Sequence, residues 1–175
     1  MLALAPFAFA LDYQINANIH YDKYTETVLD VLQSSAPALG DRPGVIVIHG
    51  SHADKEMMFD PYCLPFVRHG LVVANVEYRA ASADDVLDAA KWFREHAAQN
   101  KVDPKRIIVV GAYEGGQLAR MAGMMLGAAN IAGVIDFYGT SDMVNAKGQP
   151  PVLALNGSDL WPQIFQWLKK HKISN

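Results

Sequence analysis

Continuous apolar runs alternate with amphipathic stretches along most of this chain. The runs are rich in β-branched residues, which is typical of strands buried on both faces of a sheet. They cover residues 45–48, 71–78, 107–110, 131–137 and 152–155. Between them, apolar residues at intervals of three or four predict helices over residues 56–69, after the N-cap Ser82, and over 117–126 and 161–171. This strand–helix alternation predicts a doubly wound, mostly parallel α/β sheet with three αβα layers.

The first part of the chain follows a different pattern. Residues 13–20 alternate between apolar and polar, which predicts a half-exposed antiparallel strand. Residues 25–32 predict a second, weaker strand, and residues 34–44 predict a loop. The sheet therefore begins with a two-stranded antiparallel segment, and we expect one domain over residues 13–175.

The first twelve residues allow two interpretations. They are apolar and small, and Ala8-Phe9-Ala10 has the A-x-A form of a signal-peptidase site. The segment is either the remnant of a secretion signal, which would place the protein outside the cell or in the periplasm, or an apolar N-terminal arm. It is too short to span a bilayer, and no transmembrane segment follows.

Composition narrows the functional classes. Of the 175 residues, 51% are hydrophobic and 19% are charged, which is enough to form a core within one domain. The net charge of −3 argues against nucleic-acid binding and against a polybasic membrane surface. The single cysteine, Cys63, excludes an internal disulfide, and its apolar helical surroundings indicate a buried, inert thiol. No group of residues has metal-ligand or phosphate-loop spacing, so no cofactor or metal is expected.

The central stretch combines a strand, a sharp turn and a helix. Residues 107–110 are β-branched, Gly111, Gly115 and Gly116 surround the turn, and residues 117–126 are amphipathic. This is the setting of a nucleophile elbow, G-x-S-x-G, in which the middle residue stands above the edge of the sheet. Here the middle residue is Tyr113.

Several stretches in this order resemble the α/β-hydrolase fold, specifically its small carboxylesterase- and lipase-like branch. The stretches that carry the resemblance are Leu29-Asp-Val31, Val45-Ile-Val-Ile-His-Gly50, Val76-Glu-Tyr-Arg79, Asp103-Pro-Lys-Arg-Ile107 and Ile131-Ala-Gly-Val-Ile-Asp-Phe-Tyr-Gly139. The resemblance implies a hydrolase architecture without a cap domain. It also implies that the last strand of the family and its histidine-bearing loop are missing here.

The resemblance also assigns the oxyanion donors and the nucleophile position. The donors would come from Gly50, Ser51 and Glu114, and Tyr113 would stand where the family has serine. A phenol is mostly un-ionised at neutral pH, and its oxygen lies several ångströms farther from the backbone than a serine hydroxyl. Tyr113 is therefore either an unusual nucleophile or a side chain that fills a vacant site.

The remaining two roles are open. Asp159, in the Gly157-Ser-Asp turn, is either the acid that orients the base or an aspartate capping the last helix. His171 is the one histidine downstream of it, and it is either the base or a basic residue that favours the C-terminal end of that helix.

Two hypotheses follow. The protein is a carboxylesterase-like enzyme acting on small esters, impaired by Tyr113 and by the lack of a clear catalytic histidine. Alternatively, it is an inactive, degenerate, truncated or engineered hydrolase scaffold with a binding or structural role. A missing edge strand would leave the sheet edge unpaired, which predicts a homodimer.

Overall fold

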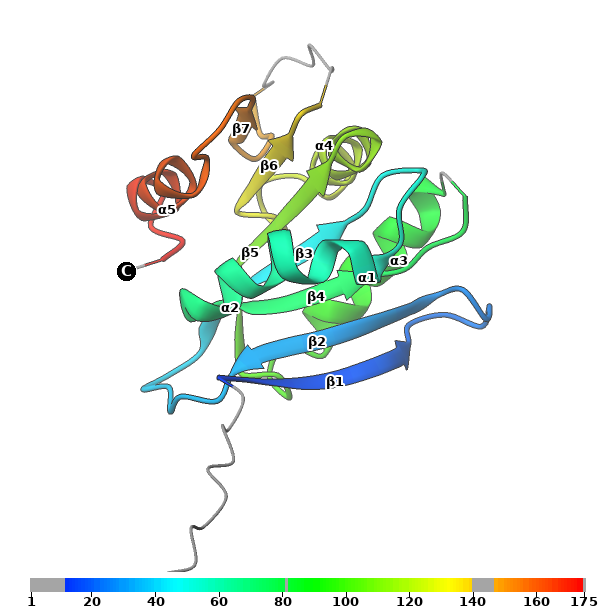
Figure 1. The fold of residues 1–175 in the computed structure, drawn as a ribbon, viewed down its shortest axis with the longest axis horizontal. Coiled ribbons are helices and arrows are strands. Elements are labelled where there is room, and N and C mark those ends of the chain that lie inside the picture. The colour runs from blue at the N-terminus through cyan, green and yellow to red at the C-terminus, as the bar shows by residue number, and fades with distance from the viewer. Residues whose placement is uncertain (1–11, 81, 140–146, 175) are drawn as a thin grey trace, which may run out of the picture.

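A computed structural model describes residues 12–80, 82–139 and 147–174 of the protein. Its seven strands form one sheet in the order β1-β2-β4-β3-β5-β6-β7 (Figure 1). The strands are β1 (Tyr13–His20), β2 (Val28–Ser34), β3 (Arg42–Ile48), β4 (Val72–Val76), β5 (Val102–Ala112), β6 (Gly133–Phe137) and β7 (Val152–Leu155). The pairs β1–β2 and β2–β4 are antiparallel and the other pairs are parallel, so the predicted α/β sheet with an antiparallel start is confirmed.

Helices cover both faces of this sheet. The helical segments are α1 (Lys55–Met58), the π-helix η1 (Phe59–Cys63), α2 (Leu64–Arg68), α3 (Ala83–Glu95), α4 (Glu114–Leu126) and α5 (Trp161–Lys170). Helices α3 and α4 pack on one face, while the α1–α2 segment and α5 pack on the other. Alternate residues of β3 serve the two layers, because Ile46 and Ile48 face the first and Val45 and Val47 face the second.

Some predicted boundaries were wrong. Strand β3 begins at Arg42, inside the stretch predicted as a loop, because the Arg42 N–H donates to Lys101 O at 2.8 Å. Strand β5 begins at Val102, five residues before the apolar run 107–110 that predicted it, and it includes Asp103 and Pro104. Strand β2 ends at Ser34, since its residues pair with the whole of β1. In each case pairing across the sheet outweighs the local pattern.

The prolines of the first helical segment have separate effects. Pro61 lies in the π-helix η1, and Pro65 lies in the first turn of α2, where its missing N–H is tolerated. Gly70 follows α2 with φ 81°, as expected for a helix-ending glycine. Cys63 is fully buried, and burial raises the pKa of its thiol, which agrees with an inert core residue.

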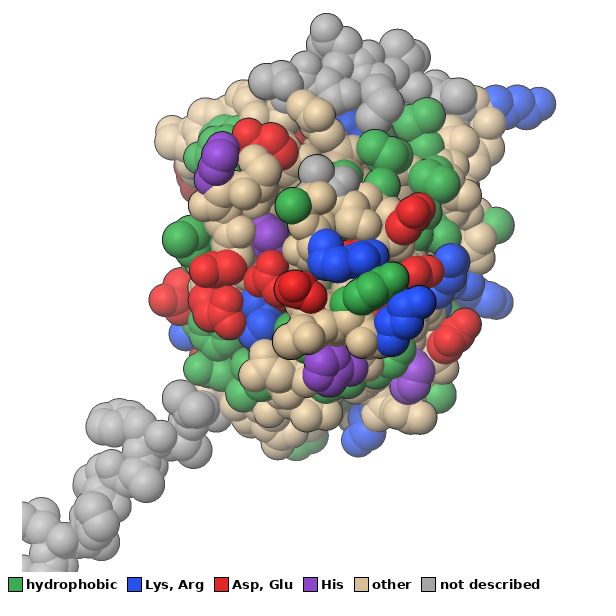
Figure 2. All heavy atoms as spheres, turned by 90° about the vertical axis from the view of Figure 1, so that its right-hand side faces the viewer, with side chains coloured by type: hydrophobic (Ala, Val, Ile, Leu, Met, Phe, Trp, Pro, Cys, Tyr) green, Lys and Arg blue, Asp and Glu red, His purple; other side chains and the backbone are tan. Residues whose placement is uncertain are grey.

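The Ala8–Ala10 motif lies outside the described residues. Within the described part of the chain, no helix is long and apolar enough to cross a membrane, and no cluster of histidine, cysteine and acidic residues could hold a metal ion. Figure 2 shows acidic and basic side chains interspersed on the face that it presents.

Gly111 lies where β5 meets the start of α4, and a Cβ atom there would stand 2.0 Å from Gly115 O. We expect Gly111→Ala to destabilise the protein by about 2 kcal/mol or more, because backbone atoms would have to move. Gly40→Ala is the control, since nothing lies within 4 Å of a Cβ at Gly40. Chemical denaturation measures both, and equal stabilities for the two variants would contradict this account of the turn.

Candidate functional site

The turn between β5 and α4 holds Tyr113 in a rare backbone conformation. Its φ is 55° and its ψ is −120°, a strained combination for a residue with a side chain. The Tyr113 N–H donates to Phe137 O at 2.8 Å, and the Gly116 N–H donates to Tyr113 O at 3.0 Å. The side chain projects from the turn with 57% exposure, and its ring stacks on Tyr138 with 5.3 Å between centroids.

The turn packs directly against the end of β3. A Cβ at Gly115 would lie 2.4 Å from His49 O and 2.5 Å from Ile48 O. This close approach brings the loop after β3 to Tyr113. A Cβ at Gly50 would lie 2.8 Å from Glu114 Oε2 and 3.7 Å from Tyr113 Cβ. The structure therefore brings together three of the predicted site residues, Gly50, Tyr113 and Glu114.

A groove of about 420 Å³ opens beside Tyr113. Most of its lining is apolar, and its polar side chains come from a histidine, a glutamate and two tyrosines. The lining residues are Gly50, His52, Ala53, Met57, Met58, Tyr62, Ala112, Tyr113 and Glu114. Burial raises the pKa of Tyr62 to about 12, so this phenol stays protonated. Ser51, the third predicted oxyanion donor, is exposed in the same loop and does not line the groove.

The predicted acid and base lie apart. Asp159 is exposed in the turn that follows β7, with φ 57°. His171 follows α5, and its Nδ1 lies 2.9 Å from Trp167 O. Helix α5 runs back along the sheet, so its end lies near Arg106, whose Nη1 donates to Ile173 O at 3.4 Å. From Arg106 to Tyr113, β5 extends roughly 20 Å, so the structure does not bring His171 to Tyr113.

His52 was not singled out from the sequence, yet it lines the groove together with Tyr113. The order of the strands could have indicated that His52 lies near Tyr113. The loop of His52 follows β3, the turn of Tyr113 follows β5, and these parallel strands are neighbours in the sheet. Because carboxyl ends of neighbouring parallel strands meet at one edge, their loops share a site.

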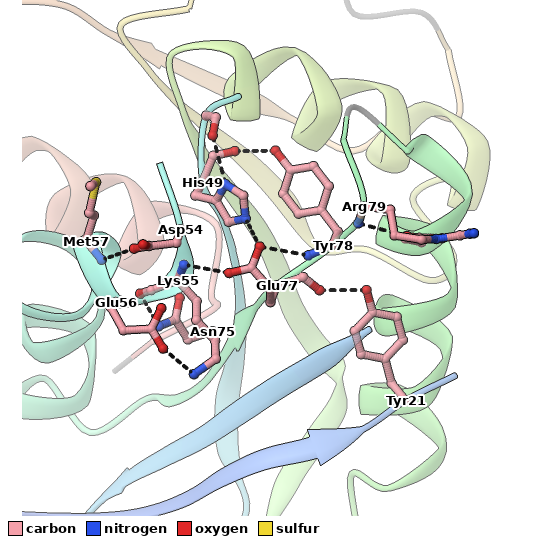
Figure 3. A network of polar contacts seen from close by, with 12 residues as sticks. Tyr21, His49, Asp54, Lys55, Glu56, Met57, Asn75, Glu77, Tyr78 and Arg79 are labelled. Carbon is pink, nitrogen blue, oxygen red and sulfur yellow. Dashed lines mark hydrogen bonds and ion pairs between the residues drawn. The ribbon is translucent and has the colours of Figure 1, made fainter. Parts of the chain in front are cut away.

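A polar network extends behind this loop (Figure 3). The Nδ1 of His49 lies 2.8 Å from Gly50 O, and its Nε2 lies 2.9 Å from Glu77 Oε1. Both partners are acceptors, so this geometry favours an imidazolium whose two ring nitrogens both donate, paired with a carboxylate. The Tyr78 ring stacks on His49, and its hydroxyl donates to His49 O at 2.6 Å.

The same network contains a buried lysine. Lys55 is 5% exposed, and its Nζ donates to Asp30 Oδ2 at 2.8 Å and to Glu56 Oε1 at 2.9 Å. Its N–H donates to Glu77 Oε2 at 3.1 Å, and its carbonyl accepts from Asn75 Nδ2 at 2.7 Å. These contacts anchor the start of α1 to β2 and β4.

A second buried ion pair lies beneath α4. Arg120 Nε donates to Asp136 Oδ2 at 2.5 Å, and both side chains are buried. A Cβ at Gly116 or Gly139 would lie 1.9 or 2.0 Å from Asp136 Oδ1. Glycine at these two positions therefore lets the carboxylate sit against the turn and the end of β6.

Comparisons with known proteins point to esterases. The family model BD-FAE matches residues 29–173. A bacterial heroin esterase is similar with a TM-score of 0.61 and 26% identity, over 71% of this chain and 43% of that one. Esterase B from Lactobacillus rhamnosis has a TM-score of 0.74 and 15% identity, over 93% of this chain and 73% of that one. A truncated carbohydrate esterase from gut microbiota has a TM-score of 0.66 and 21% identity, over 79% and 61%.

These likenesses differ in what they establish. The chain spans less than half the length of the heroin esterase. The other two identities are low enough that they show the fold alone. A search of curated proteins found no match.

The His49–Glu77 pair makes stability depend on pH. Burial lowers the pKa of His49, but the hydrogen bonds to Glu77 and Gly50 O outweigh it and raise the pKa above its ordinary value. Burial raises the pKa of Glu77, but the hydrogen bonds from His49 and Lys55 outweigh it and lower the pKa. The stabilisation by His49 is complete below its unfolded-state pKa of about 6.5 and is lost as pH rises through its folded pKa. The stabilisation by Glu77 is complete above its unfolded-state pKa of about 4.3 and is lost as pH falls through its folded pKa.

We therefore expect stability to decline as pH rises from about 6.5 through the folded pKa of His49. His49→Gln should cost about 2–3 kcal/mol near pH 6 and should remove most of this decline, because it removes the charged donor of a half-buried carboxylate. Urea denaturation across this pH range is the measurement. Lys91→Gln is the control, since it breaks an exposed pair with Asp88 and should cost less than about 1 kcal/mol. A wild-type profile that is flat above pH 6 would contradict the charged state of His49.

Proposed function

The chain belongs to the BD-FAE family, an α/β-hydrolase-type esterase family, and we propose that the groove beside Tyr113 binds small esters while its hydrolytic chemistry is impaired or absent. One observation carries the second half of this proposal. The residue at the tip of the β5–α4 turn is a tyrosine, and His171 lies at the other end of α5 from the predicted acid.

The position of Tyr113 supports a nucleophile elbow whose nucleophile has been replaced. The turn has the strained φ, the flanking glycines and the strand–turn–helix order of such an elbow. The phenol oxygen, however, stands farther from the backbone donors than a serine hydroxyl would. Catalysis tolerates errors of about 1 Å poorly, so donors arranged for serine would miss the oxyanion of a tyrosine-bound acyl group.

The electrostatics of the turn support the same proposal. The backbone N–H of Glu114 and the loop at Gly50 are the predicted oxyanion donors, but the Glu114 carboxylate lies against Gly50. A negative side chain at this place opposes a second negative charge on a reacting oxygen. Glu114 therefore disfavours the transition state that the backbone donors would stabilise.

The groove itself suits a small apolar ligand. Its volume of about 420 Å³ lies within the range of about 300–1,000 Å³ typical of small-molecule sites. Met57, Met58 and Tyr62 supply apolar contact, and the Met57 side chain is 60% exposed. An acyl chain would cover this surface, which supports ester binding without requiring turnover.

A second candidate function is slow hydrolysis of small esters. It is favoured by His52, whose side chain lines the same groove as Tyr113 and could act as a base for it or for water. In this alternative the enzyme would work without the predicted partners Asp159 and His171.

Hydrolysis of p-nitrophenyl butyrate separates the two candidates. We expect wild type, Tyr113→Phe and His52→Gln to show the same rate, close to that of buffer, because the turn lacks an activated nucleophile. Turnover well above buffer that is lost in Tyr113→Phe would show a phenol nucleophile, and loss in His52→Gln would show a histidine base. His20→Gln is the matched control, since His20 is exposed on β1.

Binding is measured with p-nitrobutyranilide, an amide analogue that resists hydrolysis. Titration calorimetry should show saturable binding that weakens at least about fivefold in Met57→Lys, because a charge replaces apolar contact surface. Met125→Lys is the control, since Met125 is equally exposed on α4 but does not line the groove. Equal affinities in both variants, or no binding to wild type, would contradict ester binding at this site.

We also propose that the protein self-associates through β7. Strand β1, at one edge, is irregular at Asn18, which has φ 55°, and such bulges protect edges from pairing. At the other edge, Pro151 O accepts from Val134 of β6, and Leu155 O accepts from Tyr138, which directly follows β6. The ladder alternation therefore turns the backbone groups of Val152 and Ala154 outward.

Ala154→Pro tests this proposal, because proline removes an outward N–H while the inward bonds remain. Sedimentation at high concentration should show dimer in wild type and monomer in the variant. A monomeric wild type would contradict it.

A further inference from the structure

One carboxylate holds both ends of the loop that forms a wall of the groove. Glu77 Oε1 accepts from His49 Nε2 at 2.9 Å, and Glu77 Oε2 accepts from the Lys55 N–H at 3.1 Å (Figure 3). The five residues between these contacts, 50–54, include Gly50, His52 and Ala53, which line the groove. The loop that follows β3 is thus closed by the side chain of Glu77, which follows β4.

The contact at His49 requires a charged ring. A neutral imidazole has one N–H, but Gly50 O and Glu77 Oε1 are both acceptors. Loss of a proton from His49 would leave one of these oxygens facing a nitrogen lone pair. Either Gly50 O, which also accepts from the Ala53 N–H at 3.1 Å, or Glu77 Oε1 would then lose its hydrogen bond to the imidazole.

The groups around His49 favour its charge, and they come from three parts of the fold. Glu77 and the Tyr78 ring follow β4, Asp54 belongs to the loop, and Glu114 belongs to α4 and lies against Gly50. Lys55 is the cation that shares the Glu77 carboxylate with His49. Its ammonium turns away to Asp30 and Glu56, so only its N–H faces Glu77.

The two ends of the loop differ in strength. The Lys55 end has additional anchors in Asp30 and in Asn75, which donates to Lys55 O. At the His49 end, the Tyr78 hydroxyl holds His49 O, but the imidazole is the side chain that joins Gly50 O to Glu77. A change at His49 would therefore release Gly50 and the loop while α1 stays in place.

We propose that Glu77 is a positioning residue that pins the wall of the Tyr113 groove through protonated His49, and that loss of the His49 proton loosens residues 50–54. The position of Gly50 against Glu114 and Tyr113 would change with this release, so the shape of the groove would depend on pH. The significance of that shape for ester binding rests on the proposed function, but the release itself does not.

Hydrogen exchange of the loop amides tests the release without any ligand. After correction for intrinsic exchange rates, protection of residues 50–54 in wild type should fall at least about tenfold between about pH 6 and about pH 10, a range that spans His49 deprotonation. In Glu77→Gln, whose single amide oxygen cannot serve both His49 and Lys55, protection should be low at both pH values. Glu56→Gln should behave like wild type, because Glu56 is exposed and contacts the ammonium of Lys55 and not the loop.

Two results would overturn the proposal. One is loop protection in wild type that does not change over this pH range, a measurement that needs no variant to fold. The other is a Glu77→Gln protein with wild-type loop protection at about pH 6. Failure of p-nitrobutyranilide to bind would instead contradict ester binding and would leave the loop release standing.

Discussion

The close approach of two backbones, at the end of β3 and at the start of α4, is the constraint on which the rest of the site depends. Gly115 packs against the carbonyls of Ile48 and His49 with no room for a Cβ atom. This contact places the loop after β3 beside the turn of Tyr113, and it thereby creates the groove. It also fixes the direction of the His49 backbone, so that the imidazole points to Glu77 and the loop can be pinned from behind.

The regular part of the fold could be predicted because its signals are local. Residues 13–20 and 152–155 form strands with the predicted bounds, since their side-chain patterns reflect burial directly. The start of β3 at Arg42 could not be predicted, because it depends on a bond to Lys101 from a distant part of the chain. Periodicity reports which side chains are buried, but it does not report which backbone groups pair.

The site was less predictable for the same reason. Gly50, Tyr113 and Glu114 come together as the resemblance implied, since they follow neighbouring strands. His52 lies in no motif, and Glu77 lies in a stretch that indicated the fold but assigned it no role. Their roles arise from which loop lies across the groove and which strand end lies behind it. His171 lies at the far end of α5, because a helix returning along a sheet carries its C-terminal residues away from the carboxyl ends of the strands.

The conformation of Tyr113 shows how little a turn alone says about chemistry. A positive φ at a tyrosine costs on the order of 1–3 kcal/mol, and Gly111, Gly115 and the bond to Phe137 O impose it whatever side chain is present. The fold therefore keeps an elbow-shaped turn even when its side chain is not a serine. Whether such a turn is catalytic depends on which side chains lie around its tip. Those side chains are the Glu114 carboxylate and the Tyr138 ring, with His52 on the wall of the same groove. The proposal of a groove that binds without turnover rests on this set, because no hydrogen bond among the described residues aligns a carboxylate and an imidazole on Tyr113 as activation of a nucleophile would require.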